Sequence, residues 1–313
     1  MKKILFLTKK LSSNFHRLEL PFGQLKNFEP ASTFGDADIV VFNRFPYGYS
    51  IEEVLAARKK YKFKIWLDID DYWRHPILPL KFFKGFQIET LMKSADVITT
   101  TNEVLASRAR LLNNNTLVVP NALPFDQGQF SLRPEDFRHE HIHFIISSSS
   151  SNWQNTTLLR NLPDTDVPLL VAGYSPGDKY FKKMFKTIDI ATKKALPLKN
   201  FSNYMEVYDE ADCLLVPMLS TAHNAAKSNL KTLEAGCKGL AMIASKTLPY
   251  YQPADEKFID FASCKSEWVA LLNYYKNNKN YVYEKGNLLA EHVRENYHLN
   301  KVNEIRAQII ESL

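Results

Sequence analysis

Short apolar runs alternate along the chain with longer segments in which hydrophobic residues recur every three or four positions. The runs include Ile4–Leu7, Ile39–Phe42, Ile65–Ile69, Leu169–Ala172 and Leu240–Ala244. A brief run that is apolar at nearly every position is typical of a strand buried on both faces of a parallel sheet. The helical segments between the runs supply the crossovers that parallel strands need. The pattern therefore predicts an α/β protein with doubly wound sheets.

The alternation is interrupted once, over residues 123–140, where prolines and charged residues replace the periodic pattern. We interpret this stretch as a linker between two Rossmann-like domains, residues 1–122 and 141–290. Residues 291–313 are expected to form a C-terminal helix that packs back on the first domain. Two such domains face each other across a cleft, and open α/β sheets bind ligands beyond the carboxyl ends of their strands.

Composition narrows the class of protein. With 45% hydrophobic and 24% charged residues, the chain of 313 residues is typical of a globular protein. No apolar run approaches the roughly 20 residues that span a bilayer. The cysteines, Cys213, Cys237 and Cys264, are too far apart for a disulfide framework or a zinc pattern, which favours the cytoplasm. The run His139-Glu-His-Ile-His143 suggests a metal site, but no fourth ligand lies nearby in sequence, so none is expected.

Basic residues gather in two places on a chain of net charge +6. Four lysines recur at helical spacing over Lys179–Lys186, and a second cluster spans Arg58–Lys64. Both are consistent with solvated helix faces. They are also consistent with a surface for anionic lipid, nucleic acid or a charged glycan, and therefore with peripheral contact at a membrane.

A loop, a helix and a buried strand follow one another over residues 224–245. Ser228 is placed to cap the helix, and Lys227 and Lys231 lie at its start, where free amides, the helix dipole and ammonium groups all favour a phosphate. Glu234 lies further along the helix, and a carboxylate can accept two hydrogen bonds from a vicinal diol. A diol together with a diphosphate indicates a nucleotide.

The segment K-S-x-x-K-x-x-E-A-G at residues 227–236 resembles the nucleotide-sugar site of GT-B glycosyltransferases, in particular the retaining enzymes with a Glu-x7-Glu motif. The resemblance implies that Glu234 holds the ribose of the donor. The first glutamate of the motif is replaced by Ala226, and an inverting reaction stays open. Asn224 opens the loop before the helix and is placed to touch the sugar or phosphate of the donor. Small residues in the serine loop after the first strand of the second domain, with Ser148 and Ser149, let the backbone approach a diphosphate, and their hydroxyls can donate to it.

The predicted third strand ends in Asp68-Ile-Asp-Asp71. This sequence resembles a D-I-D-D motif of bacterial and phage GT-B enzymes, which implies an acceptor-side role for Asp70 and Asp71, with His75 as a second candidate base. Arg17, in the loop after the first strand, is expected to reach acceptor or diphosphate. Two alternatives remain: the acids cap the next turn, or Asp68 and Asp70 form the metal-binding D-x-D motif of a GT-A transferase.

The resulting hypothesis is a metal-independent glycosyltransferase that needs no cofactor and uses a nucleoside diphosphate sugar as donor. Its acceptor is a surface glycan, a lipid-linked glycan or a hydroxylated base in phage DNA. A non-catalytic module that binds a nucleotide sugar is the alternative from another class, and the loss of the first motif glutamate at Ala226 supports it.

Overall fold

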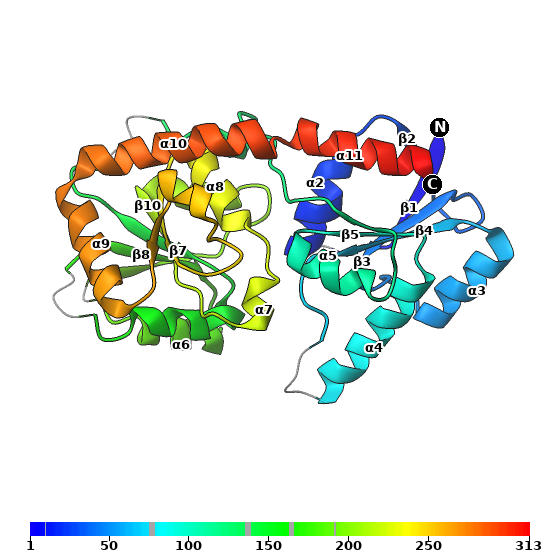
Figure 1. Cartoon of the computed structure of the whole chain (residues 1–313), viewed down its shortest axis with the longest axis horizontal. Helices are drawn as coiled ribbons and strands as arrows, with labels where there is room; N and C mark the ends of the chain where they lie inside the picture. Colours follow the sequence, from blue (N-terminus) through cyan, green and yellow to red (C-terminus); the bar gives the residue numbers. More distant parts are fainter. Residues whose placement is uncertain (10, 75–78, 135–138, 163–165, 191) are drawn as a thin grey trace. The chain divides into compact units, whose positions relative to one another are not determined.

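The computed structural model describes residues 1–9, 11–74, 79–134, 139–162, 166–190 and 192–313. The chain forms two compact units (Figure 1). The first comprises Met1–Ala122, Ala226–Ser228 and Leu299–Leu313, and the second comprises Leu123–Ala225 and Asn229–His298. Each unit contains a six-stranded sheet in which all strand pairs are parallel. The prediction of two doubly wound α/β units is confirmed.

The first sheet has the strand order β2-β1-β3-β4-β5-β6. Its strands are β1 (Lys2–Phe6), β2 (Phe28–Pro30), β3 (Ile39–Asn43), β4 (Lys64–Ile69), β5 (Val97–Thr100) and β6 (Thr116–Val118). Its helices are α1 (Ser12–Asn14), the π-helical turn η1 (Phe15–Glu19), α2 (Leu20–Gly23), α3 (Ile51–Tyr61), α4 (Pro79–Ser94), α5 (Glu103–Arg110) and α11 (Leu299–Ser312).

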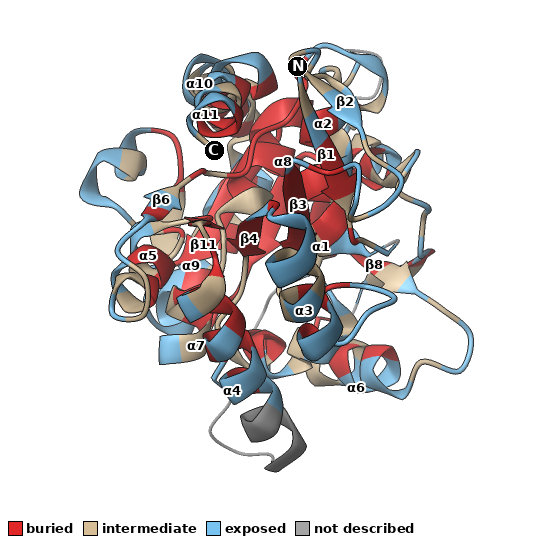
Figure 2. Cartoon of the chain, turned by 90° about the vertical axis from the view of Figure 1, so that its right-hand side faces the viewer, coloured by how far each residue is buried: buried red, intermediate tan, exposed pale blue. Residues whose placement is uncertain are grey.

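Both faces of this sheet are buried, as its apolar runs predicted. Val40 and Phe42 belong to a core cluster that includes residues of α3, α4 and α5. Ile39 and Val41, which alternate with them along β3, belong to a second cluster with residues of α2 and α11. Figure 2 shows β3 and β4 as buried strands and α3 with an exposed outer face.

Local signals define the bounds of α3. The Ser50 hydroxyl accepts from the backbone N–H of Glu53 at 3.1 Å, and the Glu53 carboxylate accepts from the backbone N–H of Ser50 at 2.6 Å. This reciprocal capping box satisfies two amide donors at the helix start. The helix ends at Tyr61. The next residue, Lys62, adopts the left-handed conformation with φ of 67° and donates its N–H to the carbonyl oxygen of Arg58.

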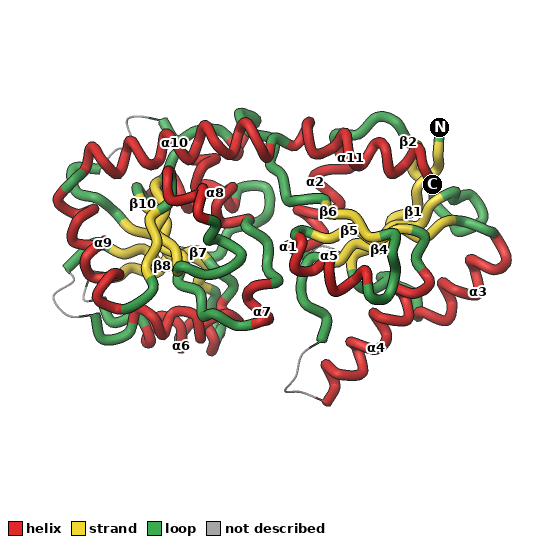
Figure 3. Tube along the Cα trace, viewed as in Figure 1, coloured by secondary structure: helices red, strands yellow, loops and turns green. Residues whose placement is uncertain are grey.

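The second sheet has the strand order β12-β11-β10-β7-β8-β9 and lies between helices (Figure 3). Its strands are β7 (Phe144–Ser147), β8 (Leu169–Tyr174), β9 (Lys193–Pro197), β10 (Cys213–Val216), β11 (Ala241–Ser245) and β12 (Asp260–Ala262). Its α-helices are α6 (Lys179–Thr187), α7 (Ala222–Ala225), α8 (Leu230–Lys238), α9 (Lys265–Asn277) and α10 (Lys279–Tyr297). Its 3₁₀ helices are η2 (Gly128–Phe130), η4 (Ser150–Leu159), η5 (Tyr204–Glu210) and η6 (Pro253–Lys257).

Helix α8 is held by a close backbone contact with α10. A Cβ atom on Gly236 would lie 2.6 Å from the Val293 side chain and 2.8 Å from the Leu289 carbonyl oxygen. A Cβ atom on Gly286 would lie 2.2 Å from the carbonyl oxygen of Gly239. Glycine at both positions therefore lets the two helices approach backbone to backbone, which fixes α8 against its neighbour.

The boundaries of the units differ from the expected ones. The described part of residues 123–140 belongs to the second unit, because Leu123, Phe125 and Phe130 are buried there and Gln129 donates to the Phe201 carbonyl oxygen at 2.8 Å. Residues 291–313 contain the end of α10, which belongs to the second unit, and the whole of α11, which belongs to the first unit. Leu299 and Ile310 of α11 are part of the core of the first unit. Within the described ranges, no helix is both long and apolar enough to cross a membrane.

Candidate active site

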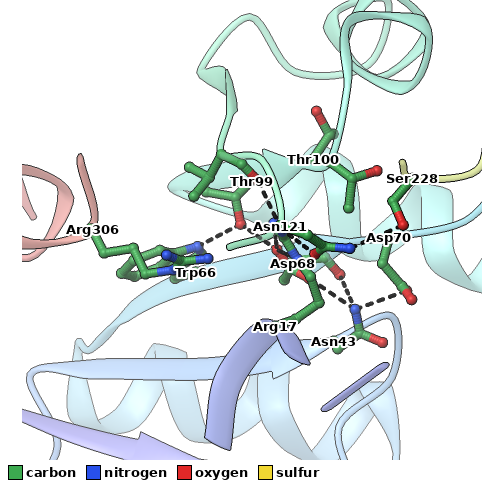
Figure 4. Close-up of polar contacts among 12 residues, drawn as sticks. Arg17, Asn43, Trp66, Asp68, Asp70, Thr99, Thr100, Asn121, Ser228 and Arg306 are labelled. Atoms are coloured by element: carbon green, nitrogen blue, oxygen red, sulfur yellow. Dashed lines mark hydrogen bonds and ion pairs between the residues drawn. The ribbon is translucent and has the colours of Figure 1, made fainter. Parts of the chain in front are cut away.

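The carboxyl ends of β3, β4 and β5 in the first unit carry a buried polar network (Figure 4). At its centre is Asp68, 2% exposed, whose carboxylate accepts from Arg17 Nη2 at 2.7 Å, Thr99 Oγ1 at 2.7 Å and Asn43 Nδ2 at 2.9 Å. Burial raises the pKa of Asp68, but the charge of Arg17 and the hydrogen bonds from Arg17, Thr99 and Asn43 outweigh it, so this pKa lies below its ordinary value. Asp68 is therefore a structural anion.

Arg17 lies on the π-helical turn η1 and is 2% exposed. In addition to the ion pair with Asp68, its Nη1 donates to the Val119 carbonyl oxygen at 2.7 Å and to Asn121 Oδ1 at 3.1 Å. The guanidinium is thus engaged from several sides inside the unit. These contacts give Arg17 a structural role that the sequence did not predict, because its partners come from β4 and from residues beyond β6 that no local sequence pattern reveals. Its contact with acceptor or diphosphate stays a prediction.

The sequence analysis did not identify Arg306, which lies on α11 and is 1% exposed. Its Nη1 donates to Asn303 Oδ1 at 3.0 Å. Burial is the main reason that its pKa falls to about 9, and the charge of Arg17 lowers it further while Asp68 opposes the shift. A signal was present in the sequence, because Arg306 falls at helical spacing within the apolar stripe of Leu299, Val302, Ile309 and Ile310.

Asp70 lies at the rim of this network, with a side chain that is 17% exposed. Its Oδ1 accepts from Asn43 Nδ2 at 3.0 Å and lies 3.1 Å from Arg44 Nε. Burial raises the pKa of Asp70, Arg44 opposes that shift, and the negative charge of Asp68 adds to it, so the pKa lies above the ordinary value. Asn43 donates to both acids, and it therefore fixes Asp70 relative to the Arg17–Asp68 ion pair.

The other acceptor-side candidates are less tightly placed. Asp71 is half-buried, and its Oδ1 accepts from the backbone N–H of Tyr72 at 2.9 Å. His75 lies outside the described residues. Asp71 and His75 therefore stay predictions, and Asp70 is the candidate acid whose surroundings are best defined.

A second polar cluster lies in the other unit, around Glu234 of α8. Its carboxylate is buried, with 1% exposure of the residue, and Oε2 accepts from Tyr208 OH and from Lys231 Nζ, each at 2.5 Å. Lys231 Nζ also lies 2.9 Å from Tyr208 OH and 3.5 Å from Ser147 Oγ at the end of β7. Burial, followed by the charge of Glu234, raises the pKa of Tyr208 well above its ordinary value, so Tyr208 remains a hydrogen-bond donor.

The remaining predicted donor residues of this unit lie in two loops. Ser148 and Ser149 lie between β7 and η4, and Ser149 Oγ is 2.8 Å from Ser151 Oγ. Asn224 is buried, and its Nδ2 donates to Asn155 Oδ1 at 2.9 Å and to the Leu219 carbonyl oxygen at 2.8 Å. Asn224 thus holds its own loop closed, and its contact with the donor stays a prediction.

Lys227 and Ser228 belong to the first unit, although the sequence placed them with the second. Asn121 Nδ2 donates to Ser228 Oγ at 2.9 Å, and Asn102 Nδ2 donates to the Lys227 carbonyl oxygen at 2.9 Å. Ser228 does not cap α8, because the residue before that helix is Asn229 and it makes no capping hydrogen bond through its side chain. Ser228 instead joins the Arg17–Asp68 network through Asn121.

Neither the D-x-D motif at Asp68 nor the described histidines of the run His139–His143 form a cluster of metal ligands within the described residues. Asp68 is occupied by Arg17, Thr99 and Asn43, so it is not available as half of a D-x-D metal site. His139 and His143 stack with ring centroids 3.9 Å apart, and His139 Nδ1 lies 3.0 Å from Asp212 Oδ2. Among the residues that the structure describes, no three His, Cys, Asp or Glu side chains are grouped so that they could hold a metal ion.

No protein-family model matches the sequence, and no curated protein matches it either. Solved structures do match. HepE of Anabaena, in complex with UDP and glucose, has a TM-score of 0.72 at 12% identity, with both chains covered over 100% of their length. TarM of S. aureus has a TM-score of 0.63 at 14% identity, with 88% of this chain and 55% of TarM covered.

A UDP-forming α,α-trehalose-phosphate synthase from Burkholderia xenovorans matches 93% of this chain and 75% of its own, with a TM-score of 0.58 at 12% identity. The likeness to these three proteins is one of fold. The chain therefore has the GT-B fold, with two Rossmann-like units, and the single-domain GT-A alternative is excluded.

Proposed function

We propose that the protein is a glycosyltransferase that moves a sugar from a nucleoside diphosphate sugar to an acceptor hydroxyl. The observation that carries this proposal is the buried carboxylate of Glu234, which Lys231 and Tyr208 hold near the end of β7. Parallel α/β sheets bind ligands at this edge. The GT-B fold, which HepE of Anabaena shares in its complex with UDP and glucose, supports the same assignment.

Donor recognition is assigned to the Glu234 cluster. Tyr208 and Lys231 both bind Oε2 of the carboxylate, so neither of these bonds uses Oε1, which we assign to the ribose diol of the donor. Lys231, held at the start of α8, supplies positive charge and electrostatic stabilisation for the departing diphosphate. Ser148 and Ser149 offer hydroxyl donors for the same group.

Acceptor chemistry is assigned to Asp70. Burial raises the pKa of Asp70 and makes this carboxylate a stronger base, which suits it to accept a proton from an attacking hydroxyl group. Asn43 and Arg44 keep its Oδ1 in place. The acceptor is proposed to be a glycan, and the protein is proposed to act in the cytoplasm. A base that activates the acceptor hydroxyl for direct attack on the donor sugar gives inversion, so a role of Asp70 as base favours the inverting outcome over the retaining one.

Replacing Glu234 by glutamine tests the donor site. The variant should bind nucleoside diphosphate more weakly by about 1–3 kcal/mol, because a charged acceptor of hydrogen bonds becomes a neutral one. Calorimetry with UDP and with other nucleoside diphosphates measures the change. Asp209→Asn provides a matched control, since Asp209 pairs with Lys238 at 2.9 Å and has no role in the proposal. Equal affinity of Glu234→Gln and the wild type would exclude Glu234 from the donor site.

Turnover is expected to survive chelation by EDTA, because Lys231 meets the charge of the leaving diphosphate and Asp68 is already paired. Release of free nucleotide from a panel of nucleotide sugars, with an acceptor mixture present, measures turnover. Activity that vanishes with EDTA and returns with manganese would contradict the metal-independent mechanism. Tight donor binding without any turnover in this panel would favour the non-catalytic module instead.

A further inference from the structure

A hollow of about 640 Å³ lies at the amino end of strand β4 in the first unit. The polar network around Asp68 lies at the opposite, carboxyl end of the same strand. The lining residues of the hollow come from the ends of α3 and α4 and the start of β4. Figure 1 labels these three elements. Five of the lining side chains are cationic: Arg58, Lys59, Lys62, Lys64 and Lys93. We call these five residues the basic pocket. Neither the proposed donor site nor the proposed acceptor site uses any of them.

Most of the charge in the basic pocket is not neutralised. Asp96 is the acid at its margin, and its carboxylate is shared by Arg58 Nη2 at 2.7 Å and Lys64 Nζ at 3.2 Å. Lys59 and Lys62 form no ion pair with any residue in the described ranges. Lys93 is exposed at the end of α4. The ammonium groups of Lys59, Lys62 and Lys93 are therefore able to bind an anion from outside the protein.

Lys62 occupies a backbone position that favours glycine. Its φ of 67° is in the left-handed region, where a Cβ atom is strained and glycine is the usual helix-ending residue. The side chain at this position is exposed and supports no core packing. A lysine therefore occupies a strained backbone position in the lining of the hollow, where glycine would be less strained.

The geometry also selects the kind of anion. Both α3 and α4 end at the hollow, so the negative ends of their dipoles lie there, and no amide donors of a helix start are offered to a small phosphate. The carbonyl oxygen of Ser94, the last residue of α4, accepts a hydrogen bond from Arg58 Nη1. What remains is a set of ammonium and guanidinium groups on long flexible stems. Such an array fits a diffuse layer of negative charge better than one compact anion.

An aromatic side chain accompanies this array. Tyr61 is 44% exposed on the last turn of α3, and Lys60 Nζ lies 4.8 Å from the centre of its ring. Exposed tyrosine beside lysine is typical of surfaces that meet lipid headgroups. We propose that the basic pocket, with Tyr61, docks the protein peripherally on an anionic membrane surface. This inference does not depend on the proposed transferase activity.

The test is co-sedimentation with vesicles of phosphatidylcholine and phosphatidylglycerol, compared with vesicles of phosphatidylcholine alone. The wild type should bind the anionic vesicles, and it should dissociate from them as the salt concentration rises, because salt screens the attraction between opposite charges. The triple variant Lys59→Gln, Lys62→Asn, Lys93→Gln should bind about 100-fold more weakly, which corresponds to about 1 kcal/mol for each lysine. Asparagine suits the left-handed position of Lys62, and Arg58 and Lys64 keep their ion pairs, so the fold is preserved.

Two further variants make the outcome decisive. Lys179, Lys182 and Lys186 lie on the exposed face of α6, and their replacement by glutamine removes the same charge from a different surface. Lys183 is left in place because its ammonium lies 3.6 Å from the centre of the Trp153 ring. This control variant should retain binding, and Lys59→Arg, Lys62→Arg, Lys93→Arg should restore it.

Three results would overturn the proposal. The first is wild-type protein that does not bind the anionic vesicles. The second is equal loss of binding in the α6 variant, which would indicate a response to net charge alone. The third is binding to duplex DNA, in place of vesicles, that the basic-pocket variant loses, which would assign the surface to nucleic acid. Turnover of nucleotide sugar serves as an independent readout that the basic-pocket variant should not change.

Discussion

Replacing Asp68 by alanine should lower the free energy of unfolding by about 3–5 kcal/mol, the usual cost of removing one partner of a buried ion pair. The reason is the charge that stays behind. Arg17 is 2% exposed and Arg306 is 1% exposed. The negative charge of Asp68 stabilises both guanidinium groups, through an ion pair with Arg17 and through a favourable electrostatic interaction with Arg306. Without this carboxylate, two buried guanidinium groups share one site with no anion to balance them.

Chemical denaturation of Asp68→Ala measures the loss. The double variant Arg17→Met, Asp68→Leu is the matched control, because apolar replacement of a complete buried pair is far less costly than removal of one member. It should recover a large part of the stability that Asp68→Ala loses. A loss below about 1 kcal/mol in the single variant, the size of an exposed pair, would show that the network contributes little.

The same residue predicts a dependence of stability on pH. Because the pKa of Asp68 in the folded protein lies below its ordinary value of 3.8, the folded state favours the charged form. This contribution is fully present above the unfolded-state pKa and is lost as pH falls through the folded-state pKa. The wild type should therefore lose stability in acid more steeply than the double variant, as denaturation midpoints at a series of pH values will show.

Replacing Asp70 by asparagine should reduce sugar transfer by roughly 10²–10⁴-fold, the usual contribution of a general base. Affinity for the nucleoside diphosphate should not change, because the Glu234 cluster belongs to the other unit. Asparagine keeps the shape of the side chain and its contacts with Asn43 and Arg44, so the loss would report on proton transfer. The kcat of transfer, with the donor affinity from calorimetry, separates these effects.

The pH profile gives a second readout for Asp70. Its pKa is raised chiefly by burial, so the protonated form, which cannot act as a base, persists to a higher pH than for an ordinary aspartate. The rate should accordingly fall on the acid side at a pH above the ordinary pKa of aspartate, and this limb should disappear in Asp70→Asn. Asp71→Asn is the comparison, and an equal or greater loss of transfer in that variant would assign the base to Asp71.

The fold was largely predictable because buried parallel strands produce apolar runs that can be recognised locally. The positions of Lys231 and Glu234 on one helix could likewise be predicted, since their spacing is set by the helix itself. The roles of Arg17 and Ser228 could not. Their partners, Asp68 and Asn121, are far away in sequence, and only the folded chain brings them together.

The boundary near residue 123 was predicted from prolines and charges, which are typical of linkers. The described residues beyond this boundary, however, belong to the second unit and do not form a separate linker. Leu123, Phe125 and Phe130 are apolar anchors in that unit, and their irregular spacing matches neither a strand nor a helix. Periodicity cannot detect burial in an irregular segment.

Helix α11 has a consequence for biosynthesis. Leu299, Val302, Ile309 and Ile310 complete the core beside β1 and β3, and Arg306 reaches the network around Asp68. The ribosome, however, makes these residues only after the whole second unit. Domains generally fold in order as they emerge, yet here α2 alone covers part of this face until α11 is made, so the sheet of the first unit stays partly exposed while the second unit folds. During translation, the nascent first unit is therefore expected to expose apolar surface of the kind that chaperones bind.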